Sequence, residues 1–519
     1  MSIKSTAAAR IALAASISAF FATTASADLT DQSCEAITDF AYPDLRIESA
    51  QYLQDAIIRD VAYPPHCRVL GFLEERTGTD GKAYATGFDL RMPQDWNDRF
   101  FFQGGGGTDG SVRNAVGTNT RGNPDTLTLG YAVASTDGGH NFGSRSDASF
   151  GLERKALIDY GYNSVELVSL ASKALIREAY GRHAKTSYFL GASNGGRQGL
   201  QAAMRHPNMF DGIVAGTPIK EQTRGHLATA WSLVVLAEMA PKDDQGRPIL
   251  SKAFPDADIE LILGDITTQC DGLDGLDDGV VDSARLCNYD ISTLICDAEK
   301  GEDCITPAQA TAFSKIHEGP VNSKGEELYA PMPYDGGADF KIWHIGDAEE
   351  WPNNGRRARN QSIKMVFRQP GDPNFDPWSF DFDDLAAVEN ASQFVDAKSP
   401  DIDAFVLGGG KLILYHAMGD SGISAIDTTR WFETLLERYG VTETAKFAQF
   451  YQLPGLGHGR LGIGPSKFPA LEAIVAWVEE GQVPEMQISG GTPERTRPMC
   501  PYPTFVTWNP SSENWDCQD

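Results

Sequence analysis

The chain has 519 residues and a formal net charge of −27, because 71 acidic side chains outnumber 44 basic ones. A surface this acidic offers no basic face to phosphate groups, so nucleic-acid binding is excluded as a function. The length is too great for one simple hydrophobic core, which predicts two lobes.

The first 27 residues have the pattern of a secretory signal peptide. Lys4 and Arg10 make a positive start, residues 11–21 form a short apolar core, and Ala25-Ser26-Ala27 is a small-residue cleavage site. No later apolar run reaches the roughly 18 residues of a membrane-spanning helix, so no membrane span is expected. We therefore expect a secreted or periplasmic protein that begins at Asp28, of unknown oligomeric state.

Short apolar runs alternate with helix-like stretches in two parts of the chain. Residues 163–180 have the apolar spacing of an amphipathic helix. Continuous apolar strands with helices between them predict a mostly parallel sheet covered on both faces. The predicted strands are residues 99–103, 131–135, 188–191, 212–215, 411–415 and 448–453.

A serine lies at the apex of a predicted strand, turn and helix, in Gly191-Ala192-Ser193-Asn194-Gly195. Small neighbours allow a sharp turn that raises the serine oxygen above the edge of the sheet, as in the nucleophile elbow of α/β-hydrolases. This setting favours a catalytic Ser193 over a chance match to G-x-S-x-G.

The alternation stops near residue 218 and resumes at Lys411. Residues 220–401 are rich in Asp, Gly, Pro and Trp, and we interpret them as a lid domain. This lid is inserted before the acid-bearing strand, the predicted strand 411–415 that precedes the candidate catalytic acid. The α/β-hydrolase catalytic domain then consists of residues 28–219 and 402–519.

The eight cysteines of an exported chain indicate disulfides. Pairing neighbours in sequence is the simplest arrangement, although eight cysteines allow about 105 connectivities. The neighbouring pairs are Cys34 with Cys67, Cys270 with Cys287, Cys296 with Cys304, and Cys500 with Cys517.

Residues 270–282 form an acidic loop with five aspartates and several glycines. Such an oxygen-rich loop suits a hard divalent cation, and we expect a structural Ca²⁺ rather than an EF-hand, whose spacing differs. An acidic, solvated turn is the alternative. The expected ligands are the carboxylates of Asp271, Asp274 and Asp278 and the carbonyls of Leu276 and Val280.

In α/β-hydrolases an acid and then a histidine follow the serine along the chain. Asp420 follows the predicted strand 411–415, and His458 lies in a glycine-rich turn after strand 448–453. We predict that they form a catalytic triad with Ser193. The alternatives are that Asp420 is a solvated loop carboxylate and that His458 is a surface histidine.

The oxyanion hole is expected to use the backbone N–H of Asn194 and a second donor from the glycine run 104–107. Glycine lets the backbone approach a substrate closely. A flexible loop is the alternative interpretation of four consecutive glycines.

Together these residues resemble the tannase and feruloyl esterase family through nearly the whole mature chain. The resemblance implies an α/β-hydrolase domain with a lid, the triad above, oxyanion donors at Gly107 and Asn194, Ca²⁺ in the acidic loop, and the four local disulfides. The segments that carry it are residues 99–111, 162–164, 191–197, 270–287, 413–428 and 495–503.

One departure from the family concerns the active site. Members usually join the serine and histidine loops by a disulfide, whereas this chain has Ala192 and Gly459 at those positions. The triad residues remain, so catalysis is expected to survive while Ser193 and His458 are held less rigidly.

The resemblance implies hydrolysis of aromatic carboxylic esters, such as mono(2-hydroxyethyl) terephthalate, with ferulate or gallate esters as the alternative. A lid arginine at Arg357 is expected to bind a substrate carboxylate, although Arg356 and Arg359 are adjacent. The alternative from another class of function is an exported binding protein that has the same fold but no catalytic activity. The other expected substrate contacts are Trp343, His416 and Ile423.

Overall fold

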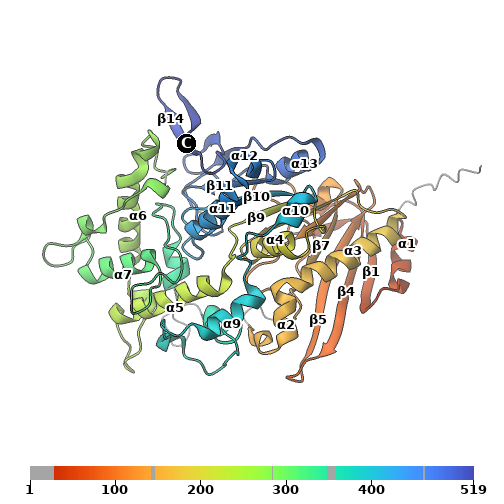
Figure 1. Ribbon diagram of the computed structural model, residues 1–519, viewed down its shortest axis with the longest axis horizontal. Helices are drawn as coiled ribbons and strands as arrows, with labels where there is room; N and C mark the ends of the chain where they lie inside the picture. The colour runs from red at the N-terminus through yellow and green to blue at the C-terminus, as the bar shows by residue number, and fades with distance from the viewer. Residues whose placement is uncertain (1–28, 142–146, 283, 348–356, 460–461, 519) are drawn as a thin grey trace, which may run out of the picture.

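The computed structural model describes residues 29–141, 147–282, 284–347, 357–459 and 462–518. The predicted signal peptide lies outside these residues. A nine-stranded sheet forms the centre, in the order β1-β4-β5-β7-β6-β8-β9-β10-β11 (Figure 1). Its strands are β1 (Leu45–Leu53), β4 (His66–Thr77), β5 (Ala83–Pro93), β6 (Arg99–Gln103), β7 (Ala132–Thr136), β8 (Thr186–Ala192), β9 (Gly212–Gly216), β10 (Lys411–Ala417) and β11 (Ala448–Leu453).

The sheet is mixed rather than entirely parallel. Strands β7, β6, β8, β9, β10 and β11 run parallel, as their continuous apolar sequences predict. Strands β1, β4 and β5 add an antiparallel part at one edge, which sequence analysis did not identify. In β1, exposed and partly buried residues alternate over much of its length, so no continuous apolar run marks it.

Helices cover both faces of the sheet. Helix α3 (Ser164–Tyr180) packs on β5 and β7, and helix α4 (Asn194–Arg205) packs on β8 and β9. Helix α13 (Ala470–Glu480) packs on β9 and β10. Because side chains alternate along a strand, Phe100 and Phe102 enter the core under α3 and α4, while Phe101 enters the core under α13.

The chain between β9 and β10 forms a large helical insertion, which lies on one side of the sheet (Figure 1). It has an apolar core of its own, to which Leu233, Ile262 and Phe313 contribute from three different helices. The insertion contains the predicted lid, residues 220–401, whose status as a separate domain stays a prediction. Its helices are α5 (Gln222–Met239), α6 (Asp256–Cys270), α7 (Pro307–Glu318), α8 (Arg357–Met365), α9 (Ala386–Val395) and α10 (Asp403–Leu407).

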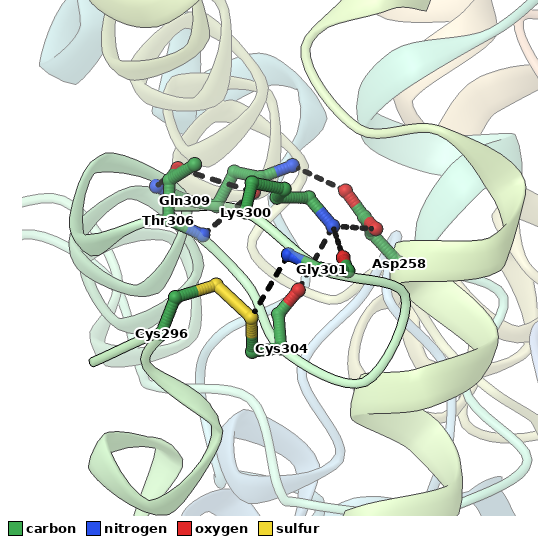
Figure 2. Close-up of a disulfide and its surroundings, with 7 residues drawn as sticks. All are labelled: Asp258, Cys296, Lys300, Gly301, Cys304, Thr306 and Gln309. Atoms are coloured by element: carbon green, nitrogen blue, oxygen red, sulfur yellow. Dashed lines mark hydrogen bonds and ion pairs between the residues drawn. A yellow bond between two sulfur atoms is a disulfide. The ribbon is translucent and has the colours of Figure 1, made fainter. Parts of the chain in front are cut away.

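All eight cysteines are paired with their neighbours in sequence, as 34–67, 270–287, 296–304 and 500–517. Figure 2 shows the Cys296–Cys304 loop of the lid, where Lys300 donates to Asp258 of α6 over 2.7 Å. Gln309 of α7 donates to the same carboxylate over 2.7 Å. The bridge thus closes a short loop that is fixed between two helices. Four disulfides are typical of a protein from an oxidising compartment.

Shorter elements complete the structure. Two C-terminal hairpins follow α13, and none of the described helices is long and apolar enough to span a bilayer. The remaining elements are α1 (Asp31–Ala36), β2 (Ala56–Ile58), β3 (Val61–Tyr63), α2 (Arg154–Ile158), α11 (Ala425–Tyr439), α12 (Val441–Thr444), β12 (Gln487–Gly490), β13 (Arg495–Pro498), β14 (Phe505–Asn509) and β15 (Asn514–Gln518).

Candidate active site

Ser193 forms the turn between β8 and α4, with a backbone φ of 63° and ψ of −123°. A non-glycine residue at positive φ is strained by about 1–3 kcal/mol, and such strain is common at functional turns. Close packing explains the flanking glycines, because a Cβ on Gly191 would lie 2.7 Å from the backbone of Gly195. The N–H of Ser193 donates to the carbonyl of Gly216 over 3.0 Å, which fixes the turn to β9.

Asp420 and His458 follow the parallel neighbours β10 and β11, so their loops leave the sheet at the same edge. His458 Nδ1 lies 2.7 Å from Asp420 Oδ2. Asp420 Oδ1 accepts the backbone N–H groups of Gly422 and Ile423 over 2.9 Å each. Burial favours the neutral acid, but His458 and a hydrogen bond from His416 outweigh it and hold the pKa of Asp420 well below its usual range. Asp420 is therefore an ionised acceptor for a histidine N–H.

Two predicted substrate contacts lie beside the Asp420 carboxylate. His416 is completely buried, with Nδ1 2.9 Å from the Thr428 hydroxyl and Nε2 3.5 Å from Asp420 Oδ2. Ile423 is also buried, and its carbonyl lies 3.2 Å from His416 Nε2. Both residues thus pack against the Asp420 carboxylate and support it, and their contact with a substrate stays a prediction.

The other predicted lid contacts lie close to the site or outside the described side chains. Trp343 meets the imidazole of His458 edge-on, with ring centroids 4.7 Å apart. Arg357 is the first residue of α8, and its side chain lies outside the described residues, as does Arg356.

Ser193 and His458 line one cavity of about 830 Å³ at the carboxyl ends of the parallel strands. Ligands of open α/β sheets bind in this position. Ala192 and Gly459, the positions where the sequence analysis expects other members to have bridging cysteines, also line the cavity. The structure thus brings the predicted nucleophile and base to the same open space.

The glycine run 104–107 forms another wall of the cavity, and Gly107 has a φ of +63°, which favours glycine. Neither its N–H nor that of Asn194 has a hydrogen-bond acceptor among the described residues. Both amides are therefore free to donate to an oxyanion.

Asp109 anchors this glycine run to the start of α4. The carboxylate is completely buried and accepts the Gly106 N–H over 3.0 Å, the Asn194 side chain over 2.7 Å and the Gln198 side chain over 2.9 Å. Burial raises its pKa, and these donors and Arg113 oppose that effect. Sequence analysis missed Asp109, whose only signal was an acidic residue two positions after the glycine run.

The acidic loop has suitable donors for a hard cation, but several are turned to other partners. Asp271 accepts the N–H groups of Gly279 and Val280 over 2.7 and 3.1 Å. Asp274 Oδ2 is buried without a partner, and burial with the nearby Asp278 and Asp271 charges raises the pKa of Asp274 to about 6. No group of three or more His, Cys, Asp or Glu side chains in the described ranges is arranged to hold a metal. Backbone carbonyls would have to complete a site centred on Asp274.

Asp278 of the acidic loop pairs with two arginines of β13. Arg495 Nη1 lies 3.2 Å from Asp278 Oδ1, and Arg497 Nη2 lies 3.5 Å from Asp278 Oδ2. These pairs connect the lid to the C-terminal part of the sheet domain.

Comparison with known proteins identifies the family. The sequence pattern described as tannase and feruloyl esterase matches residues 67–519. The chain belongs to this family. It is therefore a carboxylic ester hydrolase with a serine hydrolase fold, and the sequence-based family assignment is confirmed.

Among the relatives, a mono(2-hydroxyethyl) terephthalate hydrolase from Piscinibacter sakaiensis is 36% identical, over 93% of this chain and 90% of its own. A probable feruloyl esterase B-1 from Aspergillus flavus is 27% identical, over 95% of this chain and 96% of its own.

Solved structures share the fold. Feruloyl esterase B from Aspergillus oryzae has a TM-score of 0.79 and 22% identity, covering 94% of this chain and all of its own. Tannin acyl hydrolase from Aspergillus niger has a TM-score of 0.76 and 21% identity, covering 95% of this chain and 96% of its own. The predicted α/β-hydrolase fold is confirmed.

Proposed function

We propose that the chain is an exported esterase that hydrolyses aromatic esters carrying a free carboxylate, such as mono(2-hydroxyethyl) terephthalate, with Ser193 as the nucleophile. The observation that carries the assignment is the position of Ser193 and His458 on one cavity, with His458 Nδ1 bound to a buried Asp420. This arrangement has the parts of a serine hydrolase mechanism.

In that mechanism Asp420 accepts the Nδ1–H of His458, which leaves Nε2 as the base. His458 takes the proton of Ser193 Oγ while the oxygen attacks the ester carbonyl. The N–H groups of Gly107 and Asn194 donate to the resulting oxyanion. His458 then protonates the leaving alcohol, and a water molecule activated in the same way releases the acid and restores Ser193.

The charge of the cavity supports an anionic substrate. Arg59 and Arg113 line it together with His458, and none of its described lining residues is acidic. A Cβ on Gly106 would lie 2.7 Å from Arg113 Nη2, so this guanidinium lies beside the glycine run. A cationic cavity in a chain of net charge −27 favours a substrate carboxylate, which guanidinium groups bind with strong hydrogen bonds. Arg113 thus joins Arg357 as a candidate carboxylate ligand.

Ferulate and gallate esters remain the second candidate, because a relative with 27% identity is named a probable feruloyl esterase, and structures with the same fold are named feruloyl esterase B and tannin acyl hydrolase. A panel of terephthalate half-esters, ferulate esters and gallate esters separates the candidates. Our proposal expects the highest kcat/KM for the half-ester, and a clear preference for an uncharged phenolic ester would favour the alternative.

Covalent labelling of Ser193 tests the chemistry itself. We expect a sulfonyl fluoride to modify Ser193 and abolish hydrolysis of 4-nitrophenyl esters, and Ser193→Ala to lack both reactions. Mass spectrometry of the labelled protein identifies the modified residue. Label on another residue, or full activity of the alanine variant, would contradict the assignment. An unlabelled and inactive wild type would instead favour the non-catalytic binding protein.

Export and Ca²⁺ binding belong to the same proposal. The signal-like residues 1–27 and four disulfides support export, which fractionation of expressing cells would test. The unpartnered Oδ2 of Asp274 supports Ca²⁺, with Asp271, Asp274 and Asp278 and the Leu276 and Val280 carbonyls as the holding groups. The ion would stiffen the acidic loop, and no step of the reaction involves it.

A further inference from the structure

A carboxylate of the lid lies between the two loops that carry the acid and the base. Asp339 Oδ1 accepts the backbone N–H of Ser421, the residue after Asp420, over 2.9 Å. Asp339 Oδ2 accepts the backbone N–H of His458 over 2.9 Å. One carboxylate therefore connects the backbones of both loops, in addition to the side-chain bond between Asp420 and His458.

The same carboxylate also orients the tryptophan that contacts His458. Trp343 Nε1 donates to Asp339 Oδ2 over 2.7 Å, and the indole meets the His458 ring edge-on. The position of the imidazole is thus limited by Asp420 on Nδ1, by Asp339 on its backbone and by Trp343 on its ring.

Close packing allows the lid to reach these loops. A Cβ on Gly457 would lie 2.6 Å from Asp339 Cγ, and one on Gly422 would lie 2.4 Å from the Trp343 indole. Glycine at both positions lets the lid segment approach the acid and base loops. Asp339 N–H also donates to the Gly419 carbonyl over 3.2 Å, so backbone and side chain fix the same contact.

We propose that Asp339 is a positioning residue that holds the Asp420 and His458 loops in the geometry needed to activate Ser193. The inference rests on the proposed function, because it requires Ser193 to be the nucleophile. Burial and the Asp420 charge raise the pKa of Asp339, while its three N–H donors lower it and stabilise the ionised form. Through Asp339 the lid becomes part of the support of the catalytic groups rather than only a cover over substrate.

Three variants test this role. Asp339→Ala removes all three hydrogen bonds, Asp339→Asn keeps the shape but offers only one acceptor oxygen, and Trp343→Phe keeps a ring without the N–H. A matched control is Asp396→Asn, a buried carboxylate that accepts the N–H and hydroxyl of Thr223 over 3.0 and 2.7 Å.

The readouts are kcat, KM and the rate at which a small neutral sulfonyl fluoride labels Ser193. We expect Asp339→Ala to lower kcat and the labelling rate together by about tenfold or more, because displacement of a catalytic group by about 1 Å is that costly. KM should stay within about twofold. The kcat and labelling rate of Asp339→Asn should lie between those of Asp339→Ala and wild type. Trp343→Phe should lower both rates less than Asp339→Ala does, and Asp396→Asn should keep the wild-type labelling rate.

A labelling rate within about twofold of wild type in folded Asp339→Ala and Asp339→Asn would overturn the inference, as would an equal loss in Asp396→Asn. If the alanine variant does not fold, the near-isosteric asparagine variant decides the question. An active wild type with equally active Asp339 variants overturns this inference alone. A wild type with neither labelling nor esterase activity overturns the proposed function and this inference together.

Discussion

Arg113 is the described side chain that best tests which ester the cavity binds. It lines the cavity beside the glycine run, but it also acts electrostatically on Asp109, which anchors that run. A change at Arg113 can therefore affect every substrate through the oxyanion hole. The comparison of an anionic with a neutral ester cancels such shared effects and isolates binding of the carboxylate.

We expect Arg113→Gln to lower the ratio of kcat/KM for monomethyl terephthalate to that for dimethyl terephthalate by about tenfold or more. A hydrogen bond to a charged group contributes about 1.5–3 kcal/mol, which corresponds to at least that factor. Arg177→Gln, an exposed arginine on α3, is the matched control and should leave the ratio unchanged. Equal losses on both esters would assign Arg113 to the glycine run rather than to the substrate.

Single residues also mark the limit of sequence analysis at this site. Ser193, Asp420 and His458 were recognisable because each follows a buried strand in the order expected of the fold. Asp339 was not, because it lies in an irregular part of the lid and binds a backbone N–H that is 119 residues away in sequence. The surroundings of His416 were not predictable either, because a histidine at the end of a strand has the same local sequence whether it faces a cavity or a carboxylate.

At the scale of elements, continuous apolar runs predicted the central strands well. Helix α4 begins at Asn194, directly after the serine, in agreement with the predicted order of strand, turn and helix. The antiparallel strands escaped detection because they lack a continuous apolar run, as in β1, where exposed and partly buried residues alternate. Their partners are also not evident from the sequence: Leu45 of β1 faces Leu73 of β4, and Leu90 of β5 faces Ala134 of β7. Such pairings depend on the tertiary structure more than on local propensity.

The two walls of the cavity offer a direct test of how rigidly the site is held. Ala192 ends β8 beside the nucleophile, and Gly459 follows the base. We expect Ala192→Cys combined with Gly459→Cys to raise the temperature of half-inactivation once the bridge has formed, because disulfides typically stabilise by about 2–4 kcal/mol. Activity after heating, with and without reductant, measures the effect. Unchanged inactivation with the bridge verified by mass spectrometry would show that packing and Asp339 already fix the two loops.

At the scale of the whole molecule, no disulfide joins the lid to the sheet domain, since each bridge connects cysteines close in sequence. The lid is held instead by contacts such as those of Asp339 and by the acidic loop, where Asp278 pairs with Arg495 and Arg497. Stability of the lid and catalytic activity should therefore change together.

Removal of Ca²⁺ tests this coupling. We expect chelation to lower the Tm by a few degrees and to reduce esterase activity, because a ligand at 100 times its Kd stabilises the folded state by about 2.7 kcal/mol. Added Ca²⁺ should restore both, and Mg²⁺ should restore less, because it requires a stricter octahedral geometry. In Asp274→Asn, which alters the carboxylate whose Oδ2 is buried without a partner, Tm should no longer respond to Ca²⁺. Equal Tm values in chelator and in Ca²⁺ would instead mean that the arginines of β13 alone hold the acidic loop, so that the lid depends on ion pairs rather than on a bound cation.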